Sequence, residues 1–186
     1  MLSVVGARHI AKGPDLGSGG RQWFEPLVYS VGRPALKFAF MLVQDIDIAE
    51  EIVQEGFARA WASPSTPADP AEFRRWLYRI LTNLANDYFR RQKQIAGIAA
   101  PASSELDPVA TAEARSVDES LEAALRGLSL GERQAIYLRY FEDLSFRETA
   151  RILCRPQVSV RVVVHRALGK LRITLEAAGQ DRRMAV

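Results

Sequence analysis

The stretch LSFRETARILCRPQVSVRVVVHRALGKLR, residues 144–172, has the pattern of two helices joined by a sharp break. An S-x-x-E box at Ser145 marks a helix start, because the serine and the glutamate can each bond a free backbone amide of the first turn. Residues 154–156 end that helix, since a proline cannot continue it. Val160 and Val164 then recur at a helical step and can pack on the first helix. The segment therefore predicts a helix-turn-helix.

Residues 158–164 (VSVRVVV) also have a competing tendency to form a strand, because β-branched side chains favour extended backbone. A single strand would have no partner in a chain whose other segments have helical patterns. We therefore predict a helix here, on the ground that tertiary packing often overrides local propensity.

The second helix of this motif carries side chains suited to contact DNA. Arginine commonly bonds guanine in the major groove, and a valine can contact the methyl group of thymine. The predicted duplex contacts are Arg147, Arg155, Gln157, Ser159, Arg161, Val162, His165 and Arg166. The arginines placed to contact phosphates are Arg147, Arg151 and Arg155. From the pattern alone, an ordinary helical hairpin that does not bind DNA stays open as the alternative.

The rest of the chain predicts a second helical module and a linker between the two. The expected divisions are a glycine-rich lead (1–20), a first domain (21–93), an acidic linker (94–115), a second domain (116–177) and a tail (178–186). Small residues, prolines and acidic side chains mark the linker. A further S-x-x-E box, at Ser129, marks another helix start in the second domain. We expect an all-α protein of two small domains.

Within the first domain, apolar residues recur every three or four positions, as in helices that bury one face. Pro34 suits the first turn of a helix, where its missing amide removes no hydrogen bond. Asp45 or Asp47 is expected to cap the next helix, and another helix is expected over about Glu72–Lys93. The predicted buried stripes of these two helices are Ile46, Ala49, Ile52, Val53, Phe57 and Ala60, and Trp76, Leu77, Ile80, Leu81, Leu84 and Tyr88.

Charges of one sign gather in separate segments. Acidic side chains dominate residues 45–55, whereas basic side chains dominate residues 72–93 and the second domain. Two basic helical modules joined by an acidic tether predict two contacts with a polyanion. Aromatic residues that can stack on unpaired bases lie among the basic residues of the first module, namely Tyr78, Tyr88 and Phe89. Solvation of helix faces would account for the charges alone equally well.

The composition argues against an enzyme, a metalloprotein and a membrane protein. The 186 residues carry a net charge of +3, with one cysteine and two histidines, which allow no intramolecular disulfide and no spaced set of metal ligands. No segment approaches the roughly 18 apolar residues of a membrane span, and the first residues lack the pattern of a signal peptide. We therefore expect a cytoplasmic protein with no catalytic residues, no cofactor, no metal and no membrane insertion.

Two more segments, VQEGFARAW (53–61) and FRRWLYRILTNLANDYFRRQK (73–93), join the helix-turn-helix in one resemblance. They are similar to the second conserved region of extracytoplasmic-function (ECF) sigma factors, which belong to the sigma-70 family. LSLGERQAIYLRYFEDLSFRETARIL (128–153), followed by VSVRVVVHRALGKLR (158–172), resembles their fourth region. The resemblance covers about Phe24–Glu176. It implies a transcription initiation factor that directs core RNA polymerase to the −10 and −35 elements of promoters.

The resemblance also implies partners and residue roles. The residues implied to dock on the clamp of the polymerase's largest subunit are Asp47, Glu51, Gln54 and Glu55, and the second-largest subunit is a further expected partner. The residues implied to melt and read the −10 element are Arg74, Arg75, Arg79, Asn83, Tyr88, Arg90 and Arg91. The loop over residues 63–70 would hold a base flipped out of the stack, and the helix-turn-helix would read the −35 element. An anti-sigma factor is an expected partner as well.

Four residues of the helix-turn-helix depart from the family pattern. Glycine is usual at Cys154 and Val158, a polar residue at Val162 and a basic one at Val163. These departures reduce the polar readout of the second helix. They suggest a greater reliance on −10 contacts, or on apolar contact through Val162. Two other functions stay open: a stand-alone helix-turn-helix regulator, and a sigma-like decoy that binds an anti-sigma factor.

Overall fold

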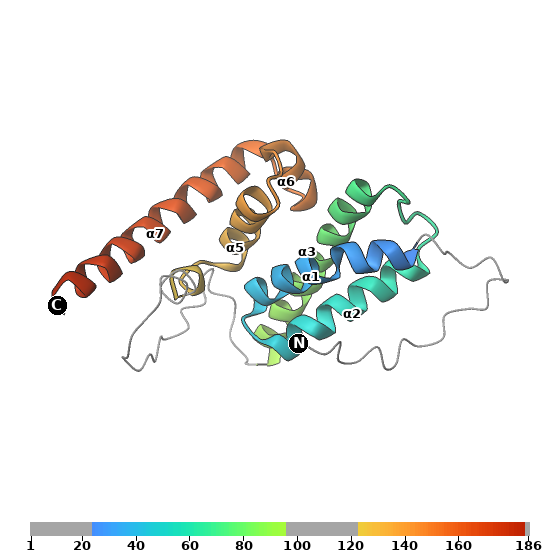
Figure 1. The fold of residues 1–186 in the computed structure, drawn as a ribbon, viewed down its shortest axis with the longest axis horizontal. Coiled ribbons are helices and arrows are strands. Elements are labelled where there is room, and N and C mark those ends of the chain that lie inside the picture. Colours follow the sequence, from blue (N-terminus) through green and yellow to red (C-terminus); the bar gives the residue numbers. More distant parts are fainter. Residues whose placement is uncertain (1–23, 96–122, 185–186) are drawn as a thin grey trace.

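The computed structural model describes residues 24–95 and 123–184, and both ranges are built from helices (Figure 1). The first range holds α1 (Phe24–Val43), α2 (Ile46–Ala62) and α3 (Pro70–Ile95). The second holds α5 (Leu130–Ile136), the π-helical turn η1 (Tyr137–Phe141), α6 (Phe146–Ile152) and the long α7 (Gln157–Met184). Neither range contains a strand, so the all-α prediction is confirmed. The predicted lead and most of the predicted linker lie outside the described residues.

Within these two ranges, no helix has the length and apolar character needed to cross a membrane.

Helix α1 continues through Pro34, so the predicted helix start at this residue is wrong. The buried side chains of α1 lie on one face on both sides of the proline, and they include Val31, Ala35 and Phe38. A proline inside a helix removes a backbone hydrogen bond and costs about 3 kcal/mol. Burial of a continuous apolar face offsets this cost, because each large apolar side chain contributes about 1.5–3 kcal/mol when it is fully buried.

Helix α2 begins at a side-chain cap. The Asp45 carboxylate accepts hydrogen bonds from the backbone amides of Asp47 (3.0 Å) and Ile48 (3.1 Å). Of the two predicted candidates, Asp45 is therefore the residue that caps the helix. The predicted buried stripe is wrong at Ile46, which is 48% exposed. At 100° per residue, Ile46 lies at the margin of the buried face that is centred on Ala49.

Helix α3 buries a face that differs in part from the predicted one. Its buried apolar side chains are Phe73, Leu77, Tyr78, Leu81 and Ala85. The side chains predicted to be buried but found only half-buried are Trp76, Ile80, Leu84 and Tyr88. The neighbours that cover α3 are α1 and α2 of its own domain, and α6 of the second domain. The contact with α6 explains why the buried face differs from the predicted one. Tyr78, predicted to be available for base stacking, is 1% exposed and belongs to the core.

The two S-x-x-E boxes begin α5 and α6, as predicted. In each box the glutamate carboxylate accepts a hydrogen bond from the serine's backbone amide. Glu132 accepts from Ser129 at 2.8 Å, and Glu148 accepts from Ser145 at 2.9 Å. Both helix starts therefore come from local sequence alone.

Helices α6 and α7 form the predicted helix-turn-helix. Val160 and Val164 of α7 are buried where the two helices meet, and residues 158–164 are helical despite their β-branched composition. Cys154 lies in the turn with a φ of 50°, in the left-handed region that glycine adopts without a steric cost. The family's usual glycine at this position thus has a backbone explanation. Helix α7 continues past residue 177, the predicted end of the second domain.

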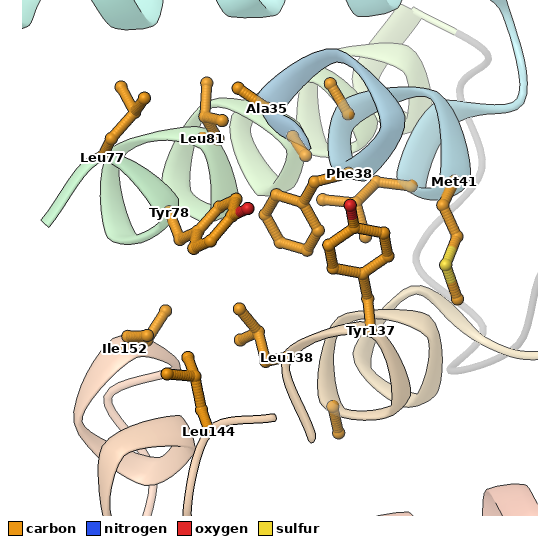
Figure 2. Close-up of a cluster of buried hydrophobic side chains, with 14 of the residues drawn as sticks. Ala35, Phe38, Met41, Leu77, Tyr78, Leu81, Tyr137, Leu138, Leu144 and Ile152 are labelled. Carbon is orange, nitrogen blue, oxygen red and sulfur yellow. The ribbon is translucent and has the colours of Figure 1, made fainter. Parts of the chain in front are cut away.

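The two helical ranges pack against each other, with α3 on α6 and α1 on α5. We call this the interdomain contact. Figure 2 shows its centre, where the side chains that face one another are Phe38, Tyr78, Tyr137, Leu138, Leu144 and Ile152. The Phe38 ring lies 5.0 Å from the ring of Tyr78 and 5.0 Å from that of Tyr137. No pattern in the sequence predicts this contact.

Candidate nucleic-acid interface

The exposed side of the helix-turn-helix carries the predicted duplex contacts. The predicted α7 residues found exposed are Gln157, Ser159, Arg161, Val162, His165 and Arg166. A hollow at the turn between α6 and α7 is lined by Arg147, Arg151 and Arg155 together with Gln157. Three guanidinium groups around one hollow create a positive potential that suits a phosphate group.

An aromatic ring fixes the direction of one predicted base contact. The guanidinium carbon of Arg161 lies 5.5 Å from the centre of the Phe146 ring, and that of Arg139 lies 5.3 Å from the same ring. Phe146 is the first residue of α6, and Arg161 lies in the second turn of α7. This cation–π contact holds Arg161 against α6 while its side chain stays exposed.

On α3, the structure groups some of the predicted −10 residues and separates others. Arg79, Asn83 and Arg90 are exposed and form one stripe, because intervals of four and seven residues return to the same face of a helix. Arg91 is exposed about a quarter turn away from this stripe, and Tyr88 is half-buried on another side. The stripe gives α3 an exposed side that carries two arginines and an asparagine.

Two further predicted −10 residues are engaged by the second domain. Arg74 forms an ion pair with Glu142, and Arg75 forms one with Glu148 at 3.5 Å. The Glu142 side chain is only 5% exposed, whereas that of Arg74 is 41% exposed. The sequence predicts neither ion pair, because a pair between distant segments leaves no periodic signal in either of them.

The phenols beside Glu142 stay protonated. Burial raises the pKa of Tyr78 well above its ordinary value, and the nearby Glu142 carboxylate raises it further. Burial, followed by the charge of Glu142, likewise raises the pKa of Tyr137. The Tyr137 hydroxyl can therefore act as a donor, and it donates to the backbone carbonyl of Pro34 at 3.1 Å. This bond joins the second domain to α1.

The acidic side of α2 is exposed. The predicted docking residues that lie on it are Asp47, Glu51, Gln54 and Glu55. Glu55 also pairs with Arg59 of the next turn at 2.7 Å. The spacing of these residues places them along one side of the helix, which gives α2 a negative face suited to a basic partner.

The loop between α2 and α3 is held by its own hydrogen bonds. The Thr66 hydroxyl donates to the carbonyls of Ala60 (2.5 Å) and Ser63 (3.0 Å). These bonds define the backbone of the loop that is predicted to hold a flipped base, and that role stays a prediction. Among the residues that the structure describes, no group of three histidine, cysteine, aspartate or glutamate side chains could hold a metal ion.

Two family models match the chain, one over each of its two helical ranges. The family model of sigma-70 region 2 matches residues 27–95, and that of sigma-70, region 4, matches residues 118–171. The RNA polymerase sigma factor SigV of Bacillus subtilis is 34% identical over 139 residues, which are 75% of this chain and 82% of the relative. The ECF RNA polymerase sigma factor SigL of Mycobacterium tuberculosis is 32% identical over 154 residues, or 78% of this chain and 85% of the relative.

Solved structures match the fold over most of the chain. The sigma factor RpoE, in its complex with the anti-sigma factor NepR from Bartonella quintana, gives a TM-score of 0.64 at 25% identity over 82% of this chain and 96% of that one. CnrH, in its complex with the cytosolic domain of CnrY, gives a TM-score of 0.60 at 25% identity over 86% and 92%. Two family models in order, and two relatives that match along most of their length, show that this chain belongs to the ECF group of the sigma-70 family of RNA polymerase sigma factors.

Proposed function

We propose that this chain binds core RNA polymerase and directs it to promoters that carry a −10 and a −35 element. The observation that carries the proposal is the separation of three surfaces: an acidic side of α2, a basic stripe on α3 and a basic hollow beside α7. A repressor that only occupies duplex DNA needs the last of these alone. We infer that the chain works by binding rather than by catalysis, in the cytoplasm where the polymerase acts.

The acidic side of α2 is the proposed contact with the clamp of the polymerase's largest subunit. Asp47, Glu51 and Gln54 are exposed along it, and Glu55 forms an ion pair with Arg59 of the same helix. Opposite charge at such a surface steers association and fixes its register more than it adds affinity. The second-largest subunit is the proposed partner of the second domain.

The exposed stripe of α3 is the proposed contact with the −10 element. Arg79 and Arg90 can neutralise phosphates along one strand, and Asn83 between them can bond a base edge. The half-buried Tyr88 is the remaining aromatic candidate for base stacking on this helix, together with its neighbour Phe89. Arg74 and Arg75 would join this surface only once they leave Glu142 and Glu148.

The exposed side of α7 is the proposed contact with the −35 element. Arg161 and Arg166 supply donors, and Val162, which is 43% exposed, supplies an apolar contact for a thymine methyl group. The hollow lined by Arg147, Arg151 and Arg155 would hold the adjacent backbone phosphates.

An anti-sigma factor is a proposed partner, because both solved structures that match the chain are complexes of this kind by name: RpoE with the anti-sigma factor NepR, and CnrH with the cytosolic domain of CnrY. Two other functions predict different binding results. Tight, site-specific binding of duplex DNA without polymerase would favour a stand-alone regulator. Binding of an anti-sigma factor without any DNA binding would favour a decoy.

The test is transcription with purified components. The full chain is mixed with bacterial core polymerase and genomic DNA fragments, and the 5′ ends of the transcripts are sequenced. We expect discrete starts that depend on the chain and share two upstream elements. An absence of such starts, beside an active control sigma factor, would overturn the proposal.

A pair of arginine variants tests the surface on α3. Arg79→Ala should lower transcription from these starts about tenfold, since a specific contact contributes about 1–3 kcal/mol. Arg33→Ala removes another exposed arginine, from α1, and should leave transcription unchanged. Equal losses in the two variants would show that general charge, not the α3 stripe, binds the promoter.

A further inference from the structure

Two valines occupy the centre of the exposed side of α7. Val158 is 73% exposed and Val162 is 43% exposed, although both side chains are apolar. We propose that these two residues, which we call the valine pair, read the C5-methyl groups of two thymines in the major groove of duplex DNA. The proposal rests on the proposed function for its DNA ligand. It adds Val158 to the contact and names the bases that the pair selects.

The direction of the valine pair follows from the buried face of α7. Val160, which is buried against the rest of the domain, lies two residues after Val158 and two residues before Val162. Two residues turn a helix by about 200°, so both valines point almost directly away from the domain. Both also lie in the first two turns of α7. In a helix-turn-helix, this part of the second helix meets the base edges of the major groove.

The stability of the domain does not explain valine at these two positions. Neither side chain of the pair belongs to the core, and valine is a less favourable helix residue than alanine. A β-branched side chain has one strongly preferred χ1 rotamer in a helix, so its methyl groups are held in place before a ligand binds. The valine pair therefore weakens the helix slightly but loses little conformational freedom in an apolar contact.

Basic side chains around the valine pair favour a polyanion as its ligand. At about 100° per residue, Arg161 lies on one side of the pair and Arg166 on the other. The arginines that line the hollow beside the start of α7 are Arg147, Arg151 and Arg155. Residues 157–175 of α7 include no acidic side chain. An apolar centre with cationic margins fits a major groove, where base edges lie between two phosphate backbones.

The spacing of the valine pair predicts the spacing of the thymines. Four residues advance a helix by about 6 Å, whereas neighbouring base pairs are about 3.4 Å apart. The two methyl groups should therefore lie within two base-pair steps of each other. Arg161 does not block this contact, because its guanidinium carbon is held 5.5 Å from the centre of the Phe146 ring, at the margin of the surface.

The test compares two pools of random duplex DNA, one made with thymine and one with uracil, which lacks only the methyl group. The free, full-length chain is used, because the valine pair is exposed in it. We expect sequences with two thymines at the predicted spacing to be enriched from the thymine pool, and the corresponding sequences not to be enriched from the uracil pool. No enrichment from the thymine pool, or equal enrichment from both pools, would overturn the proposal.

Single base replacements then assign each methyl group to one valine. In a selected duplex, deoxyuridine at either thymine should weaken binding about fourfold in fluorescence anisotropy, as the loss of one buried methyl group predicts. Val158→Ala should lose the sensitivity to one replacement and Val162→Ala the sensitivity to the other, because one contact cannot be lost twice. If both variants keep both sensitivities, the valine pair does not read the methyl groups.

The matched control is Ile173→Ala. Ile173 is 69% exposed and lies on the same side of α7 as Val162, about 16 Å farther along the helix. This variant should keep both sensitivities. Circular dichroism should show no loss of helix in any of the three variants, since alanine is the better helix residue.

Two further outcomes separate this proposal from its alternatives. Equal duplex affinities of the unsubstituted chain, Val158→Ala and Val162→Ala would overturn it in favour of a protein partner for the valine pair. Polymerase takes no part in these measurements. A chain that fails them and still directs discrete transcription starts would therefore keep the proposed function and lose only the reading of methyl groups.

Discussion

Gly56 lies where α2 crosses α3, and the crossing leaves no room for a side chain. A β carbon built on Gly56 would lie 2.6 Å from Cδ2 of Leu81 and 3.6 Å from Cδ1 of Leu77. Leu81 is fully buried, so it cannot turn toward solvent to make room. The crossing sets the position of α2, whose opposite side carries the proposed polymerase contact.

The effect of Gly56→Ala follows from two opposing terms. Alanine is favoured over glycine in a helix by about 1 kcal/mol, whereas an added methyl group in a well-packed core costs about 1–3 kcal/mol. The net change should therefore lie between zero and about 2 kcal/mol of destabilisation. Gly32 of α1 is the matched control, because nothing lies within 4 Å of a β carbon built there. Gly32→Ala should stabilise the domain by up to about 1 kcal/mol.

Urea unfolding followed by tryptophan fluorescence measures both effects. Trp61 lies on α2 and Trp76 on α3, so their fluorescence follows the unfolding of the helices that cross at Gly56. With a slope of about 1–3 kcal/mol per molar urea, a difference of 1–3 kcal/mol separates the two midpoints clearly. Gly56→Ala should unfold at a lower urea concentration than Gly32→Ala. Equal upward shifts would refute the tight crossing.

Three further changes concern the second domain. Cys154→Gly should raise its stability by about 1 kcal/mol in thermal unfolding followed by circular dichroism, because a side chain in the left-handed region costs about 1–2 kcal/mol. Hydrogen bonds from Ser145 lower the pKa of Glu148 below 4.5, so their stabilising contribution is complete above that pH and is lost as the pH falls through the lowered pKa. Acid titration of Glu148→Gln should lack this loss. Val162→Ala should reduce transcription more than Ile173→Ala, an exposed change farther along α7, and equal losses would count against a role for Val162.

Elements encoded by neighbouring residues could be predicted from the sequence. The cap at Asp45, the boxes at Ser129 and Ser145, and the buried valines of α7 each depend on contacts within one or two turns. The helix over residues 158–164 could not be predicted from local propensity, because its β-branched residues favour a strand. Only the lack of a predicted partner strand favoured a helix.

Elements that depend on the packing of distant segments could not be predicted in this way. Periodicity identifies an apolar face but not which neighbour covers it. The sequence therefore includes Tyr78 among the aromatic residues that can stack on bases, whereas the structure buries it beneath the second domain. The pairing of Arg74 with Glu142 could not be predicted for the same reason, since the two residues lie on distant segments of the chain. The helix through Pro34 shows the converse: a local signal for a helix start is overridden by burial along the whole of α1.

The interdomain contact covers the two proposed DNA-binding surfaces unequally. Arg74 and Arg75 of α3 are paired with carboxylates, whereas Arg161, Val162 and Arg166 of α7 are exposed in the same arrangement of the two domains. The helix-turn-helix is thus accessible to duplex DNA while two arginines of the proposed strand-binding surface are held by carboxylates. Glu142→Gln, which removes the ion pair of Arg74, should therefore strengthen binding to a single strand far more than binding to a duplex. An equal gain for both would show that the lost negative charge, and not the release of Arg74, is the cause, because charge alone acts on all phosphates alike.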